Sequence, residues 1–187
     1  FVVTNLNDPI VSYDNRTNFV DKMIINPYSD RTCPCGRRGC VESELTPSAT
    51  MSKLREVFSA EKTPFLYEAA SGSFENVNQD MITMAYEKDD KAVKEILNGE
   101  LTLLAVLLNN LYFSTNPQKI VLHQFKFQNE KAFQKLKDAV TEIGGALVSS
   151  KIELSIIEDK HRFLSGCALA IRELFFNRGG FDTSSNN

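Results

Sequence analysis

The chain has 187 residues, of which 42% are hydrophobic and 24% charged, with a formal net charge of −3. This is the composition of an ordinary globular protein, long enough to bury a core without disulfides in one domain or two small ones. The acidic balance disfavours a dedicated nucleic-acid-binding domain. With no run of about 18 apolar residues and no charged-then-apolar leader, we expect no membrane span and a cytoplasmic location.

The first part of the chain predicts short strands, then a cysteine-containing loop, then a helix. β-Branched and apolar residues on both sides of Asn7-Asp8-Pro9 are typical of a hairpin, and Thr46 followed by Pro47 is typical of a helix start. The predicted elements are a hairpin over 1–13, a strand over 22–26 stopped by Pro27, a loop over 27–43 and a helix from Thr46 through Phe58.

The second part predicts helices first and then an alternation of strands and helices. The expected elements are helices near 75–87, 89–98 and 100–113, a strand over 119–124, a helix over 129–143, a strand over 152–157 and a helix over 161–176. Such alternation indicates an α/β layer with a parallel strand pair, and Gly144-Gly145 ends the helix between the strands. The polar tail 179–187 is expected to be disordered.

Leucines at 97, 101, 104, 108 and 111 step by four and three along one of these helices. Such a stripe is compatible with a dimer zipper. Leu103, Val106 and Leu107 make the other faces apolar as well. An all-round apolar helix is normally enclosed, so we favour a buried core helix over a zipper.

Cys33, Cys35 and Cys40 lie within eight residues. Cys33 and Cys35 are too close in sequence for an easy disulfide with each other, but both sulfurs can face one ion, and Gly36 and Gly39 allow the chain to turn back toward it. The loop therefore predicts a structural zinc site, with three free thiols in a decayed site as the alternative. The Arg37-Arg38 pair, which lies between Cys35 and Cys40, is interpreted as a solvated turn rather than a phosphate contact.

A closed zinc site needs a fourth ligand, which the loop does not supply. The histidines, His123 and His161, lie far along the chain in predicted regular elements, where packing or surface roles are more common. Asp21, Asp30 and water remain alternatives. We interpret Cys167, between Gly166 and Ala168, as a small buried residue.

Cys33 through Glu42 match the pattern Cys-x-Cys-Gly-x-x-Gly-Cys-x-Glu. Pro27 precedes it, Asn116-Pro117-Gln-Lys-Ile-Val-Leu122 follows as a strand entry, and Ser165-Gly166-Cys167-Ala168 opens the last predicted helix. In this order and spacing the chain resembles the ROK (repressor, open reading frame, kinase) family. The resemblance implies the C-terminal lobe, over 1–178 with the loop 27–43 inserted, of an actin-like, ribonuclease-H-like ATPase fold.

Two departures from the family pattern bear on function. The family carries Glu-x-Gly-His before the proline, where the Glu binds sugar and the His supports the sugar and zinc sites; here Lys22 falls at the His position or three residues are deleted. Active kinases follow the Ile-Val-Leu strand with two glycines that let backbone amides approach phosphates. His123-Gln124-Phe125 stand there instead.

The resemblance and its departures together imply a non-catalytic effector and dimerisation domain of a ROK-type transcriptional regulator, either xylose-repressor-like or methicillin-resistance-anti-repressor-like. We assign metal ligands at Cys33, Cys35 and Cys40 and neither catalytic nor cofactor-binding residues. The expected partners are structural zinc, a second copy of the chain, and DNA through a domain outside this chain; ATP is not expected, and the sugar site is expected to be lost. The alternatives are a ROK sugar kinase and a purely structural zinc protein.

Overall fold

The computed structural model describes residues 19–122 and 130–155, with Thr4–Asn5, Asp8–Pro9, Cys167 and Ile171 besides. By compactness the chain divides into two units, one of Phe1–Ile120 with Phe127–Ile152 and the other of Val121–Lys126 with Glu153–Asn187. The predicted helix over 161–176 and the tail over 179–187 lie outside the described residues, apart from Cys167 and Ile171, which are both helical.

At the start of the chain, β1 (Thr4–Asn5) and β2 (Asp8–Pro9) pair antiparallel, which confirms the hairpin. Asn5 pairs with Asp8, and Asp8 and Pro9 lie in a strand, so the turn predicted at these two residues is wrong. The predicted strand over 22–26 is wrong. Its first residue, Lys22, belongs to the 3-10 helix η1 (Phe19–Lys22), and an isolated antiparallel bridge between Ile24 and Cys40 is the strand-like pairing that the structure gives to this segment.

Two helices follow the cysteine loop, and the first was not predicted. This is α1 (Val41–Leu45), which begins directly after Cys40. The helix α2 (Pro47–Val57) begins where the sequence predicts: Thr46 is its N-cap, accepting a hydrogen bond from the Ala49 amide at 3.3 Å, and Pro47 takes the first position.

The stretch beyond α2 is irregular. It holds α3 (Pro64–Ala69) and the 3-10 helix η2 (Phe74–Asn76). The helix α4 (Gln79–Glu87) follows, and its N-cap Asn78 accepts from the Met81 amide at 3.0 Å. Such a cap satisfies a helix N–H that would otherwise have no partner.

The helix α5 (Lys91–Thr115) runs unbroken through Asn98 and Gly99, so the predicted break there is wrong. A helical glycine costs only about 1 kcal/mol. Burying one leucine contributes about 1.5–3 kcal/mol, and Leu97 and Leu101 on either side are both buried. Packing therefore outweighs the local preference of the glycine.

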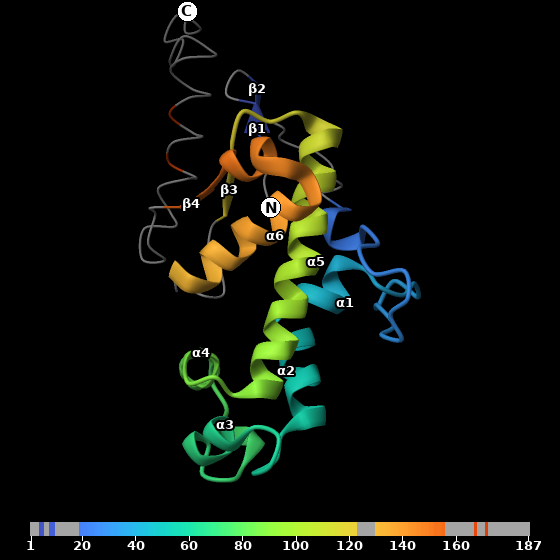
Figure 1. Cartoon of the computed structure of the whole chain (residues 1–187). Helices are drawn as coiled ribbons and strands as arrows, with labels where there is room; N and C mark the ends of the chain where they lie inside the picture. The colour runs from blue at the N-terminus through green and yellow to red at the C-terminus, as the bar shows by residue number, and fades with distance from the viewer. Residues whose placement is uncertain are drawn as a thin grey trace, which may run out of the picture. The chain divides into compact units, whose positions relative to one another are not determined.

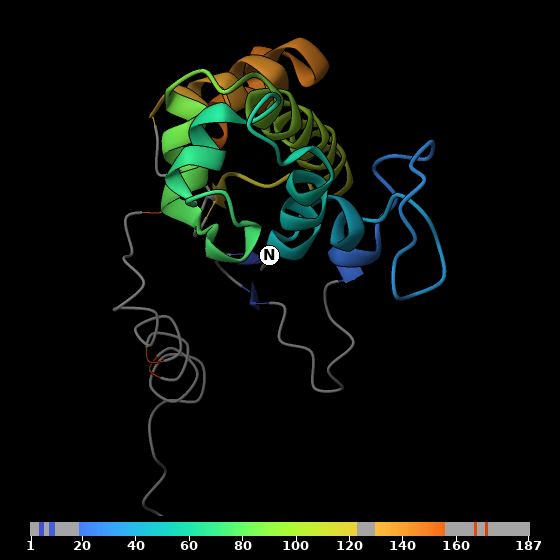
Figure 2. The same ribbon diagram turned by 90° about the horizontal axis from the view of Figure 1, so that it is seen from below.

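In Figures 1 and 2 α5 lies at the centre of the first unit, where it packs against α1, α2, α4 and α6. Leu107 is as fully buried as Leu97 and Leu108, and all three have no exposed surface. The prediction of an enclosed core helix is confirmed. By length and composition alone α5 could also cross a membrane. Its packing against four helices and the buried ion pair of Glu100 described below are instead features of a core helix.

The last described elements are β3 (Ile120–Leu122), α6 (Glu130–Ser150) and β4 (Ile152–Leu154). The strands form a two-stranded sheet in which the Ile120 amide donates to the Lys151 carbonyl at 2.8 Å and the Ser155 amide donates to the Leu122 carbonyl at 2.9 Å, a parallel pattern. The predicted strand–helix–strand order is confirmed. Gly145, with φ of +82°, interrupts α6 near the predicted end, and a further helical stretch follows it.

Candidate metal centre

The cysteine loop is held at its base by an apolar cluster. Val20, Ile25 and Val41 are buried together with Leu107 and Leu111 of α5. These contacts join the residues before and after the loop to the central helix. Figures 1 and 2 both show the loop projecting from the side of the helices, so its base is fixed while its tip faces solvent.

Backbone hydrogen bonds close the loop on itself. The Ile25 amide donates to the Gly39 carbonyl at 2.9 Å, and the Val41 amide donates to the Met23 carbonyl at 2.9 Å. Nearer the tip, the Cys33 amide donates to the Arg37 carbonyl at 2.8 Å. The two arms of the loop are thereby fixed against each other.

Gly39 is the residue that allows the close approach of the two arms. Its φ is +68°, and a Cβ built on it would lie 1.7 Å from the Asn26 carbonyl oxygen. No larger residue fits there without displacing the backbone. The glycine of the sequence pattern therefore has a direct steric reason in the structure.

The loop brings all three predicted ligands together. The sulfurs of Cys33, Cys35 and Cys40 lie within 4.8 Å of one another, and those of Cys35 and Cys40 are 3.6 Å apart. Zinc–sulfur bonds of about 2.3 Å in a tetrahedron place the sulfurs roughly 3.8 Å apart. Cys33 and Cys40 are buried, and Cys35 is exposed. These donors fit a soft or borderline metal ion such as zinc.

A carboxylate and two cations surround the three thiols. Cys33 Sγ donates to Glu42 Oε2 at 3.2 Å, and Lys22 Nζ forms an ion pair with the same oxygen. Lys22 also pairs with Asp21 at 3.1 Å, and Arg37 donates to the Lys22 carbonyl at 2.9 Å. Three thiolates around a divalent ion carry a net negative charge, which the nearby Lys22 and Arg37 partly balance.

The three thiols differ in acidity. Hydrogen bonds from the backbone and side chain of Arg37, and then from Cys33, lower the pKa of Cys35 to about 6. A hydrogen bond from the Cys35 backbone lowers the pKa of Cys33, but burial and hydrogen bonds with Cys35, Glu42 and Cys40 outweigh it and raise the pKa to about 12. Burial raises the pKa of Cys40. Cys35 is therefore the most acidic of the three thiols.

Asp21 and Asp30 do not join the three thiols in a cluster of candidate ligands within the described residues. Asp21 instead pairs with Lys22. His123 and His161 lie outside the described residues. Cys167 is exposed on a helical position, so the prediction of a buried residue there is wrong. The Glu42 carboxylate contacts Cys33 at 3.2 Å, although the sequence pattern that ends at Glu42 did not suggest it as a ligand.

A buried charge cluster beside the loop also escaped the sequence analysis. Lys53 Nζ lies 3.5 Å from Glu44 Oε2 and 3.2 Å from Glu100 Oε1, and Thr50 donates to Glu100 at 2.9 Å. Glu44 and Glu100 are only 3% and 4% exposed. Lys53 donates further to the Glu44 carbonyl at 2.7 Å. The signal in the sequence was Glu100 within an otherwise apolar stretch, together with Thr50 and Lys53 one helical turn apart.

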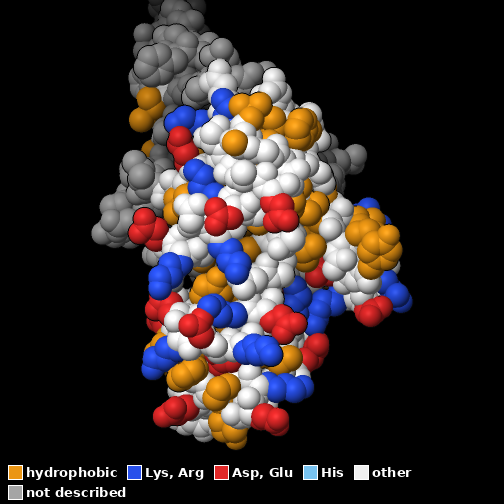
Figure 3. All heavy atoms as spheres, viewed as in Figure 1, with side chains coloured by type: hydrophobic (Ala, Val, Ile, Leu, Met, Phe, Trp, Pro, Cys, Tyr) orange, Lys and Arg blue, Asp and Glu red, His pale blue; other side chains and the backbone are white. Residues whose placement is uncertain are grey.

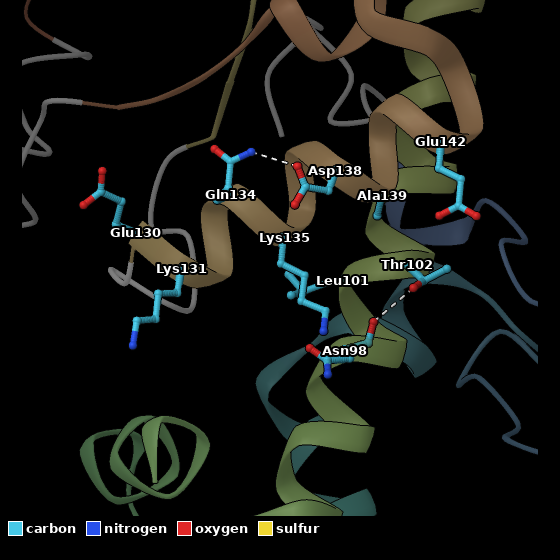
Figure 4. Close-up of a pocket in the computed structure, with 10 residues that line it drawn as sticks. All are labelled: Asn98, Leu101, Thr102, Glu130, Lys131, Gln134, Lys135, Asp138, Ala139 and Glu142. Carbon is cyan, nitrogen blue, oxygen red and sulfur yellow. Dashed lines mark hydrogen bonds between the residues drawn. The ribbon is translucent and has the colours of Figure 1, made fainter. Parts of the chain in front are cut away.

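Two hollows lie along α5. One, of about 600 Å³, is bordered by Lys53 and Glu100, whose charges are already paired with each other. The other, of about 710 Å³, lies between α5 and α6 (Figure 4). Part of its polar rim is hydrogen-bonded within itself, because Gln134 donates to Asp138 at 2.8 Å. Lys135 extends toward α5 (Figure 4). Leu101 is the buried residue of its lining. No described residue of this hollow has the buried charge expected of a binding site.

Comparison with known proteins agrees with this geometry. No curated protein matches the chain. The model of the ROK family matches residues 22–161, which contain the cysteine loop, the helical body and both strands of the parallel pair. The family includes kinases and non-enzymatic repressors and has an actin-like ATPase fold. The match spans well over half of the chain, so this protein belongs to the ROK family.

Proposed function

We propose that the chain is the non-catalytic effector and dimerisation part of a ROK-type transcriptional regulator in the cytoplasm. In this proposal it forms the C-terminal lobe of the actin-like fold, and a domain outside this chain contacts DNA. Both kinases and repressors occur in the family. The choice therefore rests on which chemical groups occupy the places where kinases bind sugar and nucleotide.

The observation that carries the proposal is the pairing of Lys22. In the family pattern a histidine of the sugar site, preceded by a sugar-binding glutamate, falls at Lys22 unless three residues are deleted, and in either case the chain lacks both. Here Phe19–Lys22 forms the 3-10 helix, and the Lys22 ammonium pairs with Glu42 and Asp21. An ammonium bound to two carboxylates cannot take the part of a neutral imidazole, and the carboxylates it holds are not free for sugar hydroxyls.

The nucleotide site is argued from the sequence. Two glycines after the first strand of the parallel pair would let backbone amides reach a phosphate. The chain has His123-Gln124-Phe125 there, outside the described residues. Phosphoryl transfer depends on positioning and electrostatic stabilisation. Loss of both sets of positioning residues supports a regulator over a sugar kinase.

Zinc belongs to this proposal as a structural ion. Cys33, Cys35 and Cys40 would hold it, and Glu42 or water would complete four-coordination. When bound, the ion would fix the projecting loop by cross-linking its two arms. Such a site contributes to folding rather than to catalysis.

Apolar surface on the first unit supports dimerisation. Phe113 on α5 is 69% exposed, and Leu147 and Ile143 on α6 are 62% and 42% exposed. Figure 3 shows hydrophobic side chains gathered over the ends of these two helices. Large apolar side chains exposed in this way are typical of an interface between subunits. We propose that a second copy of the chain covers it.

The activity test uses ATP and a panel of hexoses with coupled detection, and a ROK sugar kinase as positive control. The proposal expects no turnover above background from this chain or from the longer protein that contains it. ATP-dependent phosphorylation of any hexose by the longer protein would establish the kinase alternative instead.

The dimer is tested by light scattering coupled to size-exclusion chromatography at high micromolar concentration. The proposal expects twice the 21.0 kDa chain mass, and a monomer for Leu147→Glu. Thr141→Glu, on the exposed face of α6, is the matched control and should remain dimeric. A strict monomer of the unmodified chain would contradict the dimer.

A further inference from the structure

The geometry of the three thiols is not symmetric. Cys33 Sγ is engaged by Glu42 at 3.2 Å, whereas the sulfurs of Cys35 and Cys40 face each other at 3.6 Å. Cys35 is exposed and Cys40 has no exposed surface. One sulfur is thus open to reagents from solvent, and its nearest sulfur partner is enclosed behind it.

We propose that Cys35 and Cys40 form a reversible disulfide in the metal-free loop, with a hydroperoxide as oxidant, Cys35 as the thiol that is oxidised first and Cys40 as the resolving thiol. The inference goes beyond the regulatory role and does not rest on it. It assigns to the loop a second state, in which a covalent bond replaces the metal.

The reaction balances in two steps. The Cys35 thiolate sulfur attacks one peroxide oxygen, the O–O bond breaks, and hydroxide leaves, so that Cys35 becomes a sulfenic acid. The Cys40 sulfur then attacks the Cys35 sulfur, the S–S bond forms, and the S–O bond breaks with loss of water. Two thiols lose two electrons and two protons, and one hydrogen peroxide becomes two waters.

The loop allows the small movement that the bond requires. A disulfide needs its sulfurs about 2.05 Å apart, so the pair must close by roughly 1.5 Å. Cys35 is near the exposed tip, beside Gly36, whose added Cβ would meet no atom within 4 Å. Cys40 is fixed by the Ile24 bridge and by the start of α1. Cys35 therefore moves toward Cys40.

The consequence is exclusion of the metal. The disulfide consumes two of the three sulfur ligands, and Cys33 with Glu42 alone cannot form a closed tetrahedral site. A thiol reductant restores the dithiol through exchange. Oxidation and metal binding therefore compete for the same pair of sulfurs.

The test is peptide mapping after mild oxidation. The whole chain carries Cys167→Ser, because Cys167 is also exposed, and is treated with chelator, then one equivalent of hydrogen peroxide, then an alkylating reagent. Trypsin cleaves after Arg37 and Arg38, which separates Cys35 from Cys40. The proposal expects a linked pair of peptides, two hydrogens lighter than their sum, with Cys33 alkylated and the link reversed by dithiothreitol.

Variants identify the partners. Cys40→Ser and Cys35→Ser should each abolish the link, and Cys33→Ser should retain it. Fragmentation of the linked peptides from the Cys167→Ser chain assigns the sulfurs even if a second variant does not fold. A link through Cys33, or oxidation of Cys35 to the sulfinic acid without any link, would overturn the proposal. Because the chain is metal-free, neither outcome depends on zinc binding or on the regulatory role.

Discussion

The cysteine loop and the charge cluster of Glu44, Lys53 and Glu100 adjoin each other but are built in opposite ways. In the loop, ligands within eight residues are brought together by backbone hydrogen bonds and glycines. In the charge cluster, side chains from three helices meet although Lys53 and Glu100 are 47 residues apart in sequence. Hydrogen bonds from Ser29 to Glu44 and from Thr50 to Glu100 join the same cluster. A short motif therefore specifies the first, whereas the whole packed unit specifies the second.

The largest effect should come from breaking the charge cluster. Lys53→Ala leaves Glu44 and Glu100 buried without their cation, which costs about 3–5 kcal/mol in the free energy of unfolding. Urea denaturation at pH 7 measures it. The matched control on the same helix is Arg55→Ala, whose exposed pair with Glu75 contributes about 1 kcal/mol or less. Equal losses for both variants would show that the cluster is not a special element of stability.

In the loop, two glycines with positive φ give a second contrast. Gly39→Ala places a Cβ against the Asn26 carbonyl and must displace the backbone, whereas at Gly36 nothing lies within 4 Å. We expect Gly39→Ala to lower zinc affinity at least tenfold, the equivalent of about 1.4 kcal/mol. Gly36→Ala should reduce the free energy of zinc binding only by the strain of its backbone conformation, about 1 kcal/mol. Competition titration with a zinc chelator measures both. A smaller loss at Gly39 than at Gly36 would contradict the steric argument.

The smallest expected effect is on the number of protons that zinc binding releases, which depends on the pKa values of the three thiols. With the pKa of Cys35 near 6 and those of Cys33 and Cys40 raised, zinc binding at pH 7 should release about two protons rather than three. Affinity then rises with pH, because fewer protons remain to be displaced. Calorimetry in buffers of different ionisation enthalpy counts the protons.

Arg37→Ala is the matched variant for that measurement. Removing the guanidinium raises the pKa of Cys35, so proton release should move toward three. Release of three protons by the unmodified chain would show that Cys35 is not ionised before the metal binds.

The difference between the two regions also explains what the sequence could predict. The clustering of Cys33, Cys35 and Cys40, the cap at Thr46 and the strands β3 and β4 could be predicted because each depends on neighbours in sequence. The strand expected over 22–26 was wrong because the returning arm of the loop, through Cys40, decides what that segment pairs with. The break expected at Gly99 was wrong because tertiary burial decides the length of α5.

The central claim is that a metal ion held by the three cysteines cross-links the arms of the loop and leaves the packing of the helices unchanged. Hydrogen exchange of backbone amides, with and without one equivalent of zinc, tests it most directly. We predict that zinc slows exchange at the Cys33, Gly36 and Gly39 amides and leaves the amides of α5 unchanged. Identical exchange of the loop with and without zinc would contradict the claim.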